Sequence, residues 1–323
     1  MVSAADARAR SRLRRRVLDW YAANGRPLAF RATADPWAIL VSEVMAQQTQ
    51  AARAAEAWSS FLAAYPTPAA LATAPTAEVI RAWRGLGYNR RAISLQGAAR
   101  AIVRDHDGAV PSDLESLLRL PGVGPYTARA VAALAFGRRV GAVDTNVRRV
   151  IGRAFLGSAS PDPRVVQALA DELAPPRRTR EWTHALMDVG ATRCRVRDPR
   201  CTACPLRTRC AWAATLGDPG QSSVTAGSPR GGIGSAPRTG STPRSGPRRL
   251  AFRATSRWLR GRILDRLRDL DVGAWLTFDE PIGEHSTVAL AAALAAMSRD
   301  GLVDLGSHPL VARLPAGSGD HAA

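Results

Sequence analysis

Residues 120–128 read Leu-Pro-Gly-Val-Gly-Pro-Tyr-Thr-Ala, which places two glycines in a short turn between segments of helical composition. Gly122 and Gly124 carry no Cβ, so a partner can come close to the backbone on either side of Val123. The amide groups at the start of a helix running from Tyr126 would point at an anion. This geometry suits a DNA phosphate and gives no sequence specificity. A tight turn that only connects two helices is the alternative interpretation.

The segments around this turn have the pattern of helices. From residue 2 to residue 212, Ala and Leu are abundant and apolar residues recur at three- and four-residue spacing, which predicts a mainly α fold. Clusters of glycine, proline and asparagine interrupt the pattern, and each cluster predicts the end of a helix. The predicted breaks are 24–27, 65–68, 85–87, 108–111, 121–124, 157–163 and 175–176.

The composition changes towards the C-terminus. Residues 216–248 are rich in Gly, Ser, Pro and Arg and almost free of apolar side chains, which predicts a disordered linker. Residues 249–316 regain an apolar pattern, with a helical stripe from Leu259 to Leu270 and a second helix capped by Ser286. Helix, helix and two strands resemble a small winged-helix unit, and a helical appendage that packs on the main body is the alternative. The two predicted strands are Leu302–Leu305 and Leu310–Leu314.

The formal net charge is +18, from 45 basic and 27 acidic residues, and the sequence contains no lysine. So large an excess of arginine predicts a polyanionic partner, most simply nucleic acid. Because no lysine amine is present, no side chain can form a Schiff base. No apolar run approaches the length of a membrane span, so we expect no membrane partner.

All four cysteines fall in one window with the spacing C-x6-C-x2-C-x5-C: Cys194, Cys201, Cys204 and Cys210. Four soft ligands in one loop predict a metal centre, for which zinc and an iron–sulfur cluster are the candidates. A zinc ribbon usually has two C-x2-C pairs and this window has one, so the spacing favours a [4Fe–4S] cluster over zinc. Two disulfides are a third alternative. No signal peptide precedes the chain, so we expect a reducing compartment, which disfavours disulfides.

Taken together, three features resemble the endonuclease III superfamily of DNA glycosylases over about residues 20–212. They are the two-glycine turn, the segment Val143-Asp-Thr-Asn-Val147 and the cysteine window. The resemblance implies a two-lobed helix-hairpin-helix fold with a DNA-binding cleft between the lobes. It also implies that residues 1–35 and 144–215 form the lobe that bears the cluster, and that residues 36–143 form the helix-hairpin-helix lobe.

Within that superfamily, three segments resemble the MutY-type adenine DNA glycosylases: 37–50 (WAILVSEVMAQQTQ), 85–88 (GLGY) and 185–191 (ALMDVGA). This resemblance implies removal of adenine mispaired with 8-oxoguanine or guanine, in base excision repair. The lyase branch of the superfamily carries a lysine after the hairpin, where this chain carries Tyr126. A tyrosine cannot form an imine, so the resemblance implies a monofunctional glycosylase.

Two carboxyl groups would carry the chemistry that the resemblance implies. Glu43 would protonate the adenine ring, and Asp144 would stabilise the positive charge on the sugar or form a transient covalent adduct. The apolar neighbours of Glu43 predict a pKa raised by desolvation, and a position at a helix start predicts a charged Asp144. Asn146 would orient the water or the sugar, and Tyr126 would shape the pocket. An ordinary surface glutamate and a structural N-cap are the alternatives for the two acids.

Adenine inside a duplex is unreachable, so the base must be flipped out. By resemblance, Gln48 and Tyr88 would wedge into the stack, while Thr49 and Leu86 would contact the opposite purine. The residues that the resemblance assigns to the adenine pocket are Arg26, Leu28, Phe30, Arg31 and Asp188. The remaining candidates for DNA binding are Gly122, Val123 and Gly124 in the hairpin and Arg195, Arg197 and Arg200 in a basic run beside the cysteines.

Two other functions stay open from the sequence. A mismatch thymine or uracil DNA glycosylase of the same fold would share the glutamate and the tyrosine. A cluster-containing DNA-binding regulator would use the C-terminal unit to read sequence. Many adenine glycosylases carry a C-terminal domain related to nucleotide-diphosphate hydrolases, whose Phe-Ser-His loop is absent from this sequence. We expect a monomer that acts on double-stranded DNA at the nucleoid, in the cytoplasm.

Overall fold

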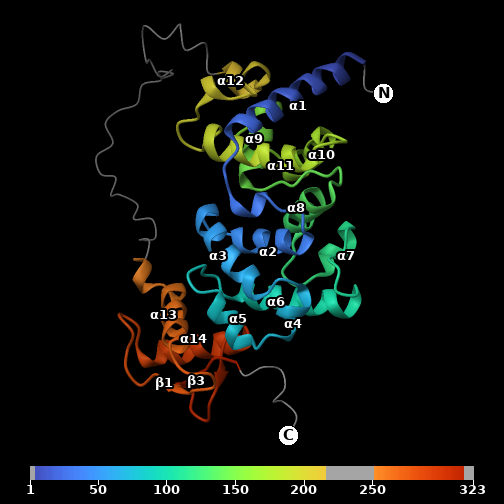
Figure 1. Cartoon of the computed structure of the whole chain (residues 1–323). Helices are drawn as coiled ribbons and strands as arrows, with labels where there is room; N and C mark the ends of the chain where they lie inside the picture. The colour runs from blue at the N-terminus through green and yellow to red at the C-terminus, as the bar shows by residue number, and fades with distance from the viewer. Residues whose placement is uncertain (1–3, 216–250, 316–323) are drawn as a thin grey trace, which may run out of the picture.

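The computed structural model describes residues 4–215 and 251–315 (Figure 1). This part of the chain is mainly helical, as the apolar spacing predicts, which confirms a mainly α fold. Residues 1–3, 216–250 and 316–323 lie outside the described residues, and the whole of the predicted linker, 216–248, lies there too. Within the described ranges, no helix is long and apolar enough to cross a membrane.

Short and medium helices make up residues 4–215. Their bounds are α1 (Ala4–Asn24), η1 (Ala29–Arg31), α2 (Pro36–Ala46), α3 (Ala51–Ala64), α4 (Pro68–Thr73), α5 (Thr76–Ala82), α6 (Arg90–Asp105), α7 (Leu114–Arg119), α8 (Pro125–Phe136), α9 (Thr145–Leu156), α10 (Pro163–Leu173), α11 (Thr179–Asp188), η2 (Val189–Arg193), η3 (Cys201–Ala203), η4 (Arg207–Arg209) and α12 (Ala211–Thr215). Each predicted break falls between two of these helices. The breaks between α2 and α3, between α4 and α5 and between α8 and α9 are not predicted, and the first of these carries neither glycine nor proline.

Many of the helices begin with one signature, a side chain that accepts a hydrogen bond from an amide of the first turn. Such caps are Asp35 in α2, Thr67 in α4, Asp113 in α7, Asp144 in α9 and Asp162 in α10. A proline stands in the first turn of α2, α4, α8 and α10, where its missing N–H has no helical partner to lose. α8 and α9 end at Gly137 and Gly157, both in the left-handed conformation.

α2 lies at the centre of the main hydrophobic core (Figure 1). Every residue from Trp37 to Met45 is buried, because α3, α6 and α8 all pack against this helix. At one end of the molecule α1 lies beside α11 and α12 lies beside α9, so distant parts of residues 4–215 come together there. The core runs from that end through α2 to α7. The side chains of α2 are therefore held in fixed positions.

The C-terminal unit, residues 251–315, contains two helices and a small sheet. Its elements are η5 (Phe252–Ala254), α13 (Ser256–Arg268), β1 (Leu276–Thr277), α14 (Thr287–Arg299), β2 (Asp304–Leu305) and β3 (Val311–Arg313). The sheet is antiparallel with the strand order β1-β3-β2, and Leu276 pairs with Ala312. The two helices, β2 and β3 lie where the sequence predicts them. β1 is not predicted, because two residues are too few to show an alternating pattern.

The C-terminal unit packs on the main body through α5. Ala77 and Ile80 of that helix belong to the same hydrophobic cluster as residues of α13 and α14. Arg268 is buried at this contact, and it donates hydrogen bonds to the Ile80 carbonyl at 3.0 Å and to Asn89 Oδ1 at 2.8 Å. Apolar contact and buried hydrogen bonds therefore hold the unit against α5 and the start of α6.

Candidate active site

A cavity of about 860 Å³ opens where α2, the hairpin, α8 and the start of α9 meet. Its walls contain residues that the sequence analysis assigns to the chemistry, to the adenine pocket and to DNA contact. They are Glu43, Tyr126, Asp144 and Asn146, then Arg26, Leu28, Phe30 and Arg31, and finally Gln48, Thr49, Gly122 and Gly124. Separate parts of the sequence thus face one cavity.

Glu43 lines this cavity from the apolar helix α2 and is only 7% exposed. Burial raises the pKa of its carboxyl group to about 7, while the hydrogen bond with the Tyr126 hydroxyl lowers it and the charge of Asp144 raises it. A carboxyl group with a pKa near 7 holds its proton for much of the time at neutral pH, as an efficient general acid requires. The surroundings of Glu43 match the desolvated environment that its neighbours predict.

Tyr126 stands beside Glu43 in the first turn of α8. Burial raises the pKa of its hydroxyl well above the ordinary value, and the charges of Glu43 and Asp144 raise it further. The hydroxyl therefore keeps its proton and can donate a hydrogen bond. The next residue, Thr127, is buried and accepts a hydrogen bond from Gln47 Nε2 at 3.2 Å. This contact fixes the start of α8 relative to the end of α2.

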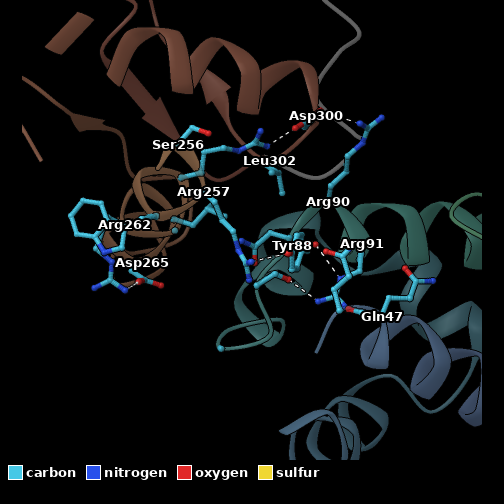
Figure 2. A pocket seen from close by; sticks show the side chains of 18 of the residues that line it. Gln47, Tyr88, Arg90, Arg91, Ser256, Arg257, Arg262, Asp265, Asp300 and Leu302 are labelled. Atoms are coloured by element: carbon cyan, nitrogen blue, oxygen red, sulfur yellow. Dashed lines mark hydrogen bonds and ion pairs between the residues drawn. The ribbon is translucent and has the colours of Figure 1, made fainter. Parts of the chain in front are cut away.

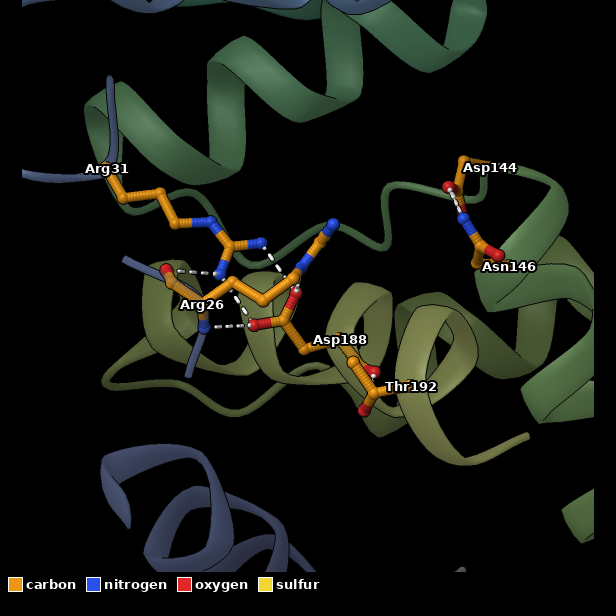
Figure 3. A network of polar contacts seen from close by, with 6 residues as sticks. All are labelled: Arg26, Arg31, Asp144, Asn146, Asp188 and Thr192. Atoms are coloured by element: carbon orange, nitrogen blue, oxygen red, sulfur yellow. Dashed lines mark hydrogen bonds and ion pairs between the residues drawn. The ribbon is translucent and has the colours of Figure 1, made fainter. Parts of the chain in front are cut away.

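Asp144 is the N-cap of α9 and also lines the cavity. Its Oδ1 accepts a hydrogen bond from the Val147 amide at 2.6 Å, and its Oδ2 accepts one from Asn146 Nδ2 at 2.9 Å (Figure 3). Asn146 Oδ1 accepts in turn from Arg149 at 2.8 Å, which fixes the amide group. The side chain of Asp144 is thus an N-cap, as the alternative interpretation of this residue predicts. It also lines the same cavity as Glu43.

Asp188 differs from the pocket residue that the resemblance implies. It is 0% exposed and accepts hydrogen bonds from Arg26 and Arg31. Arg26 donates through its amide at 2.9 Å and its Nε at 2.5 Å, and Arg31 donates through Nη1 at 2.7 Å and Nη2 at 2.8 Å (Figure 3). Burial alone would raise the pKa of Asp188, but these hydrogen bonds outweigh it and the pKa lies below its ordinary value. Asp188 therefore anchors residues 26–31 to α11 and touches no space that a base could occupy.

His184 is a cavity residue that the sequence analysis misses. It lies in α11, is buried and lines the same cavity as Glu43. Burial lowers its pKa to about 3, together with the charges of Arg31 and Arg180, so the imidazole is neutral at physiological pH. A neutral imidazole can offer one donor and one acceptor to a base. The only signal in the sequence is its place directly before the segment 185–191.

The two expected wedge residues both have a left-handed backbone, with φ +53° at Gln48 and +45° at Tyr88. Such a conformation costs a residue other than glycine about 1–3 kcal/mol, and this kind of strain concentrates at functional sites. The guanidinium of Arg91 holds the two loops together by donating to carbonyl groups on both. The carbonyls that accept from it are those of Val44, Met45, Gln47, Leu86, Gly87 and Tyr88.

Of the two residues expected to contact the opposite purine, Thr49 lines the cavity and Leu86 does not. Thr49 lines the cavity, and its hydroxyl donates to the Leu86 carbonyl at 3.3 Å. The Leu86 side chain is 4% exposed and packs in the core. The structure therefore does not support a contact between the Leu86 side chain and a base.

The hairpin exposes its glycines and hides its valine. Gly122, at φ +76°, and Gly124 are exposed, and α8 begins after Gly124 without a side-chain cap. A Cβ on Gly122 would come within 2.6 Å of the Cβ of Ser94, so the turn needs glycine there. Val123 is buried and its amide donates to the Leu120 carbonyl at 3.1 Å. Val123 therefore anchors the turn, and the two glycines form the surface that a phosphate can approach.

Of the three arginines expected to bind DNA beside the cysteines, two are exposed and one is engaged in an ion pair. Arg197 and Arg200 are exposed, whereas Arg195 forms an ion pair with Asp198. Its guanidinium also donates to the backbone carbonyl of Asp198 at 2.9 Å. Arg197 and Arg200 are therefore the better placed of the three for phosphate.

The four cysteines line one small pocket together with Arg153 and Trp212. Among residues 4–215 and 251–315, no three His, Cys, Asp or Glu side chains lie close enough together to hold a single metal ion. A zinc ion would require its thiolates to converge to about 2.3 Å from one point. The donor set, four thiols without an imidazole, fits an iron–sulfur cluster, which is larger than one ion.

Comparison with known proteins agrees with this geometry. Residues 41–176 match the HhH-GPD superfamily of base excision DNA repair proteins. The chain is 44% identical over 301 residues to an adenine DNA glycosylase from Mycobacterium tuberculosis, and the alignment covers 88% of this chain and 90% of the relative. The chain belongs to the adenine DNA glycosylase family. It is therefore a DNA glycosylase, and the interpretation as a non-enzymatic regulator is not retained.

Solved structures share the fold of this family. A thermostable thymine-DNA glycosylase is 31% identical, covers 65% of this chain and 99% of its own, and superposes with a TM-score of 0.61. An endonuclease III in a non-covalent complex with DNA is 24% identical over 67% of this chain and 99% of its own, with a TM-score of 0.55. The second likeness shows the fold alone.

Replacement Asp188→Asn tests the anchor behind the cavity. We expect the free energy of unfolding to fall by about 3–5 kcal/mol at pH 7, because the buried Arg31 guanidinium loses its counter-charge. The pKa of Asp188 in the folded protein lies below its value in the unfolded chain. The stability that its carboxylate contributes is therefore complete above about pH 4, and it is lost as the pH falls through the pKa of the folded state. Chemical denaturation of both proteins at several pH values measures the difference.

Asp198→Asn is the matched control, because it removes a carboxylate from an exposed arginine pair. It should change the free energy of unfolding by less than about 1 kcal/mol. Equal values for the two variants would contradict the anchoring role of Asp188.

Proposed function

We propose that the protein hydrolyses the N-glycosidic bond of adenine mispaired with 8-oxoguanine or guanine in double-stranded DNA, as a step of base excision repair. The observation that carries this proposal is a pair of carboxyl groups with different surroundings in one cavity. Glu43 is buried with a pKa of about 7, and Asp144 accepts hydrogen bonds at the start of a helix. Such a pair divides acid and electrostatic roles between two residues of one chemical type.

The reaction follows from these two environments. Glu43 donates its proton to the extruded adenine, at N7 of the ring, so the base leaves without the full charge of an anion. As the bond to the sugar breaks, positive charge develops at the anomeric carbon, and the carboxylate of Asp144 stabilises it. Asn146, held by Asp144 and Arg149, orients the water that adds to this carbon. Tyr126 keeps Glu43 in place through its hydroxyl.

The product of this reaction is an abasic site in an intact strand. A lyase step needs an amine that forms an imine with the opened sugar, and the sequence contains no lysine. Tyr126 lies beside the hairpin, in the wall of the cavity, and cannot form an imine. We therefore assign a monofunctional glycosylase.

DNA binding is assigned to the surface around the cavity. Gln48 and Tyr88 enter the base stack when the adenine is extruded, and the strained backbone of both residues supports this role. Gly122 and Gly124 receive a phosphate at the start of α8. Arg197 and Arg200 add phosphate contacts, so affinity should fall with salt. The protein acts as a monomer on nucleoid DNA in the cytoplasm.

The domain division rests on the packing of the helices. We assign residues 1–35 and 144–215 to the lobe that bears the cluster, residues 36–143 to the helix-hairpin-helix lobe, and residues 249–316 to a winged-helix-like unit. Two helices with a three-stranded antiparallel sheet support the last assignment. Cys194, Cys201, Cys204 and Cys210 would hold a [4Fe–4S] cluster, which would fix the shape of the loop that carries the basic run. Arg149 and Arg153 of α9 hold this loop against the main body by donating to the carbonyls of Cys194 and Arg195.

A panel of duplexes tests the function. Full-length protein is incubated under single-turnover conditions with duplexes that contain A:8-oxoG, A:G, T:G or U:G, and alkali then reveals abasic sites. We expect cleavage after alkali for the two adenine substrates only, and no cleavage without alkali. Release of thymine or uracil without adenine would contradict the assigned substrate, and strand cleavage without alkali would contradict the monofunctional mechanism.

Matched variants in the same assay separate chemistry from structure. Glu43→Gln and Asp144→Asn should each lower the rate roughly 10²–10⁴-fold while duplex binding survives, because each removes an acid–base or electrostatic group. Glu56→Gln changes an exposed glutamate on α3, and Asp162→Asn changes an equivalent N-cap on α10. Both controls should keep the wild-type rate. Equal losses in Asp144→Asn and Asp162→Asn would mean that the charge of a helix N-cap, and not the place of Asp144 in the cavity, explains its effect.

Metal analysis tests the cluster. Protein purified without exposure to air should contain iron and acid-labile sulfide at about four of each per chain. Cys204→Ser should lower both together. One zinc per chain without iron would contradict the proposal.

A further inference from the structure

Tyr88 is held by a guanidinium group on each side. The residue is 37% exposed, and the guanidinium carbons of Arg257 and Arg91 lie 3.9 Å and 5.6 Å from the ring centroid. Arg257 Nη1 also donates a hydrogen bond to the Tyr88 hydroxyl at 2.7 Å (Figure 2). The closer of the two cations thus makes both a face contact and a hydrogen bond with the same aromatic side chain.

Arg257 does not belong to the lobe that carries Tyr88. It projects from α13 in the C-terminal unit, and the opposite end of this helix carries the buried Arg268 that binds the Ile80 carbonyl. Arg260, one turn further along α13, forms an ion pair with Asp300, which also pairs with Arg90 of α6 at 3.6 Å. The position of Arg257 over Tyr88 is therefore set by the docking of the whole unit.

This contact lies along a path to the catalytic cavity. A second cavity, of about 800 Å³, separates α13 from the start of α6, and both Tyr88 and Arg257 line it (Figure 2). Gln47, Gln48 and Gly122 line this cavity and the catalytic one alike. The two cavities are neighbours that share a wall. Of the two expected wedge residues, Gln48 stands in that wall and Tyr88 lines the second cavity only.

We propose that Arg257 is a positioning residue, which holds Tyr88 in the conformation that enters the duplex and so makes the C-terminal unit part of the base-extrusion machinery. The inference rests on the proposed function. Tyr88 has a left-handed backbone, which a tyrosine does not favour in isolation, so the conformation persists only where its surroundings impose it. Arg91, from α6, fixes the backbone of the Tyr88 loop through its carbonyls. Arg257, from the C-terminal unit, fixes the Tyr88 side chain.

Loss of Arg257 should reduce the fraction of bound duplexes in which the adenine is extruded. It should leave the affinity for DNA unchanged. Without its face contact and hydrogen bond, the Tyr88 ring can leave the inserted geometry, so fewer bound duplexes reach the extruded state. We expect the single-turnover rate of adenine release to fall roughly tenfold in Arg257→Ala. The dissociation constant for an undamaged duplex should change by less than about twofold at fixed salt.

The experiment is a double-mutant cycle in the full-length protein, with Arg257→Ala, Tyr88→Ala and the double variant. Arg266→Ala is the control, because Arg266 is exposed on the same helix and its loss removes the same charge. We expect Arg257→Ala to slow adenine release in the wild-type background and to have no further effect in the Tyr88→Ala background. Arg266→Ala should keep the wild-type rate. The slope of log affinity against log salt should be the same in all of them.

A direct phosphate contact predicts different results. If Arg257 only bound phosphate, its loss would reduce the salt slope by about one and would cost the same factor with or without Tyr88. Either result, or an equal effect of Arg266→Ala, would overturn the proposal. A wild-type protein that releases no adenine would overturn the proposed function as well, whereas an active wild type with independent Arg257 and Tyr88 effects would overturn this inference alone.

Discussion

Exclusion of water from one carboxyl group is the constraint on which the site depends. Glu43 lies in α2, a helix whose residues 37–45 are all buried, and packing by α3, α6 and α8 keeps this acid away from solvent. The cost of a buried charge raises its pKa to about 7. Asp144 faces the same cavity with hydrogen bonds from Val147 and Asn146. Two acids of similar intrinsic strength thus take different chemical roles, because one is buried and the other accepts hydrogen bonds at a helix start.

Arginine has two uses in this protein. A net charge of +18 suits a polyanionic partner, and several arginines also act inside the fold by donating to backbone carbonyls. Arg91 joins the loops after α2 and α5 in this way, and Arg268 fastens the C-terminal unit to α5. A carbonyl acceptor has no net charge, so the guanidinium of Arg91 still adds to the positive field that DNA meets, whereas Arg268 also pairs with Asp265 at 3.4 Å. Structural and electrostatic roles therefore coincide.

The sequence predicts those features that depend on local chemistry. Glycine and proline mark the helix breaks, the apolar run of residues 37–45 predicts the desolvation of Glu43, and a helix start predicts the cap at Asp144. Features set by distant packing are not predictable in this way. The anchor at Asp188 and the burial of Leu86 depend on contacts with remote segments. The docking of the C-terminal unit uses the carbonyl of Ile80, and a carbonyl acceptor leaves no trace in a sequence.

The pKa of Glu43 is the quantity that tests this account most directly. Carbon-13 NMR of protein labelled at the glutamate carboxyl carbons would follow each titration, and the spectrum of Glu43→Gln would identify the resonance. We predict a midpoint of about 7 for Glu43. A midpoint at the ordinary value of 4.5 would mean that water reaches this carboxyl group, and the account of the site would be wrong.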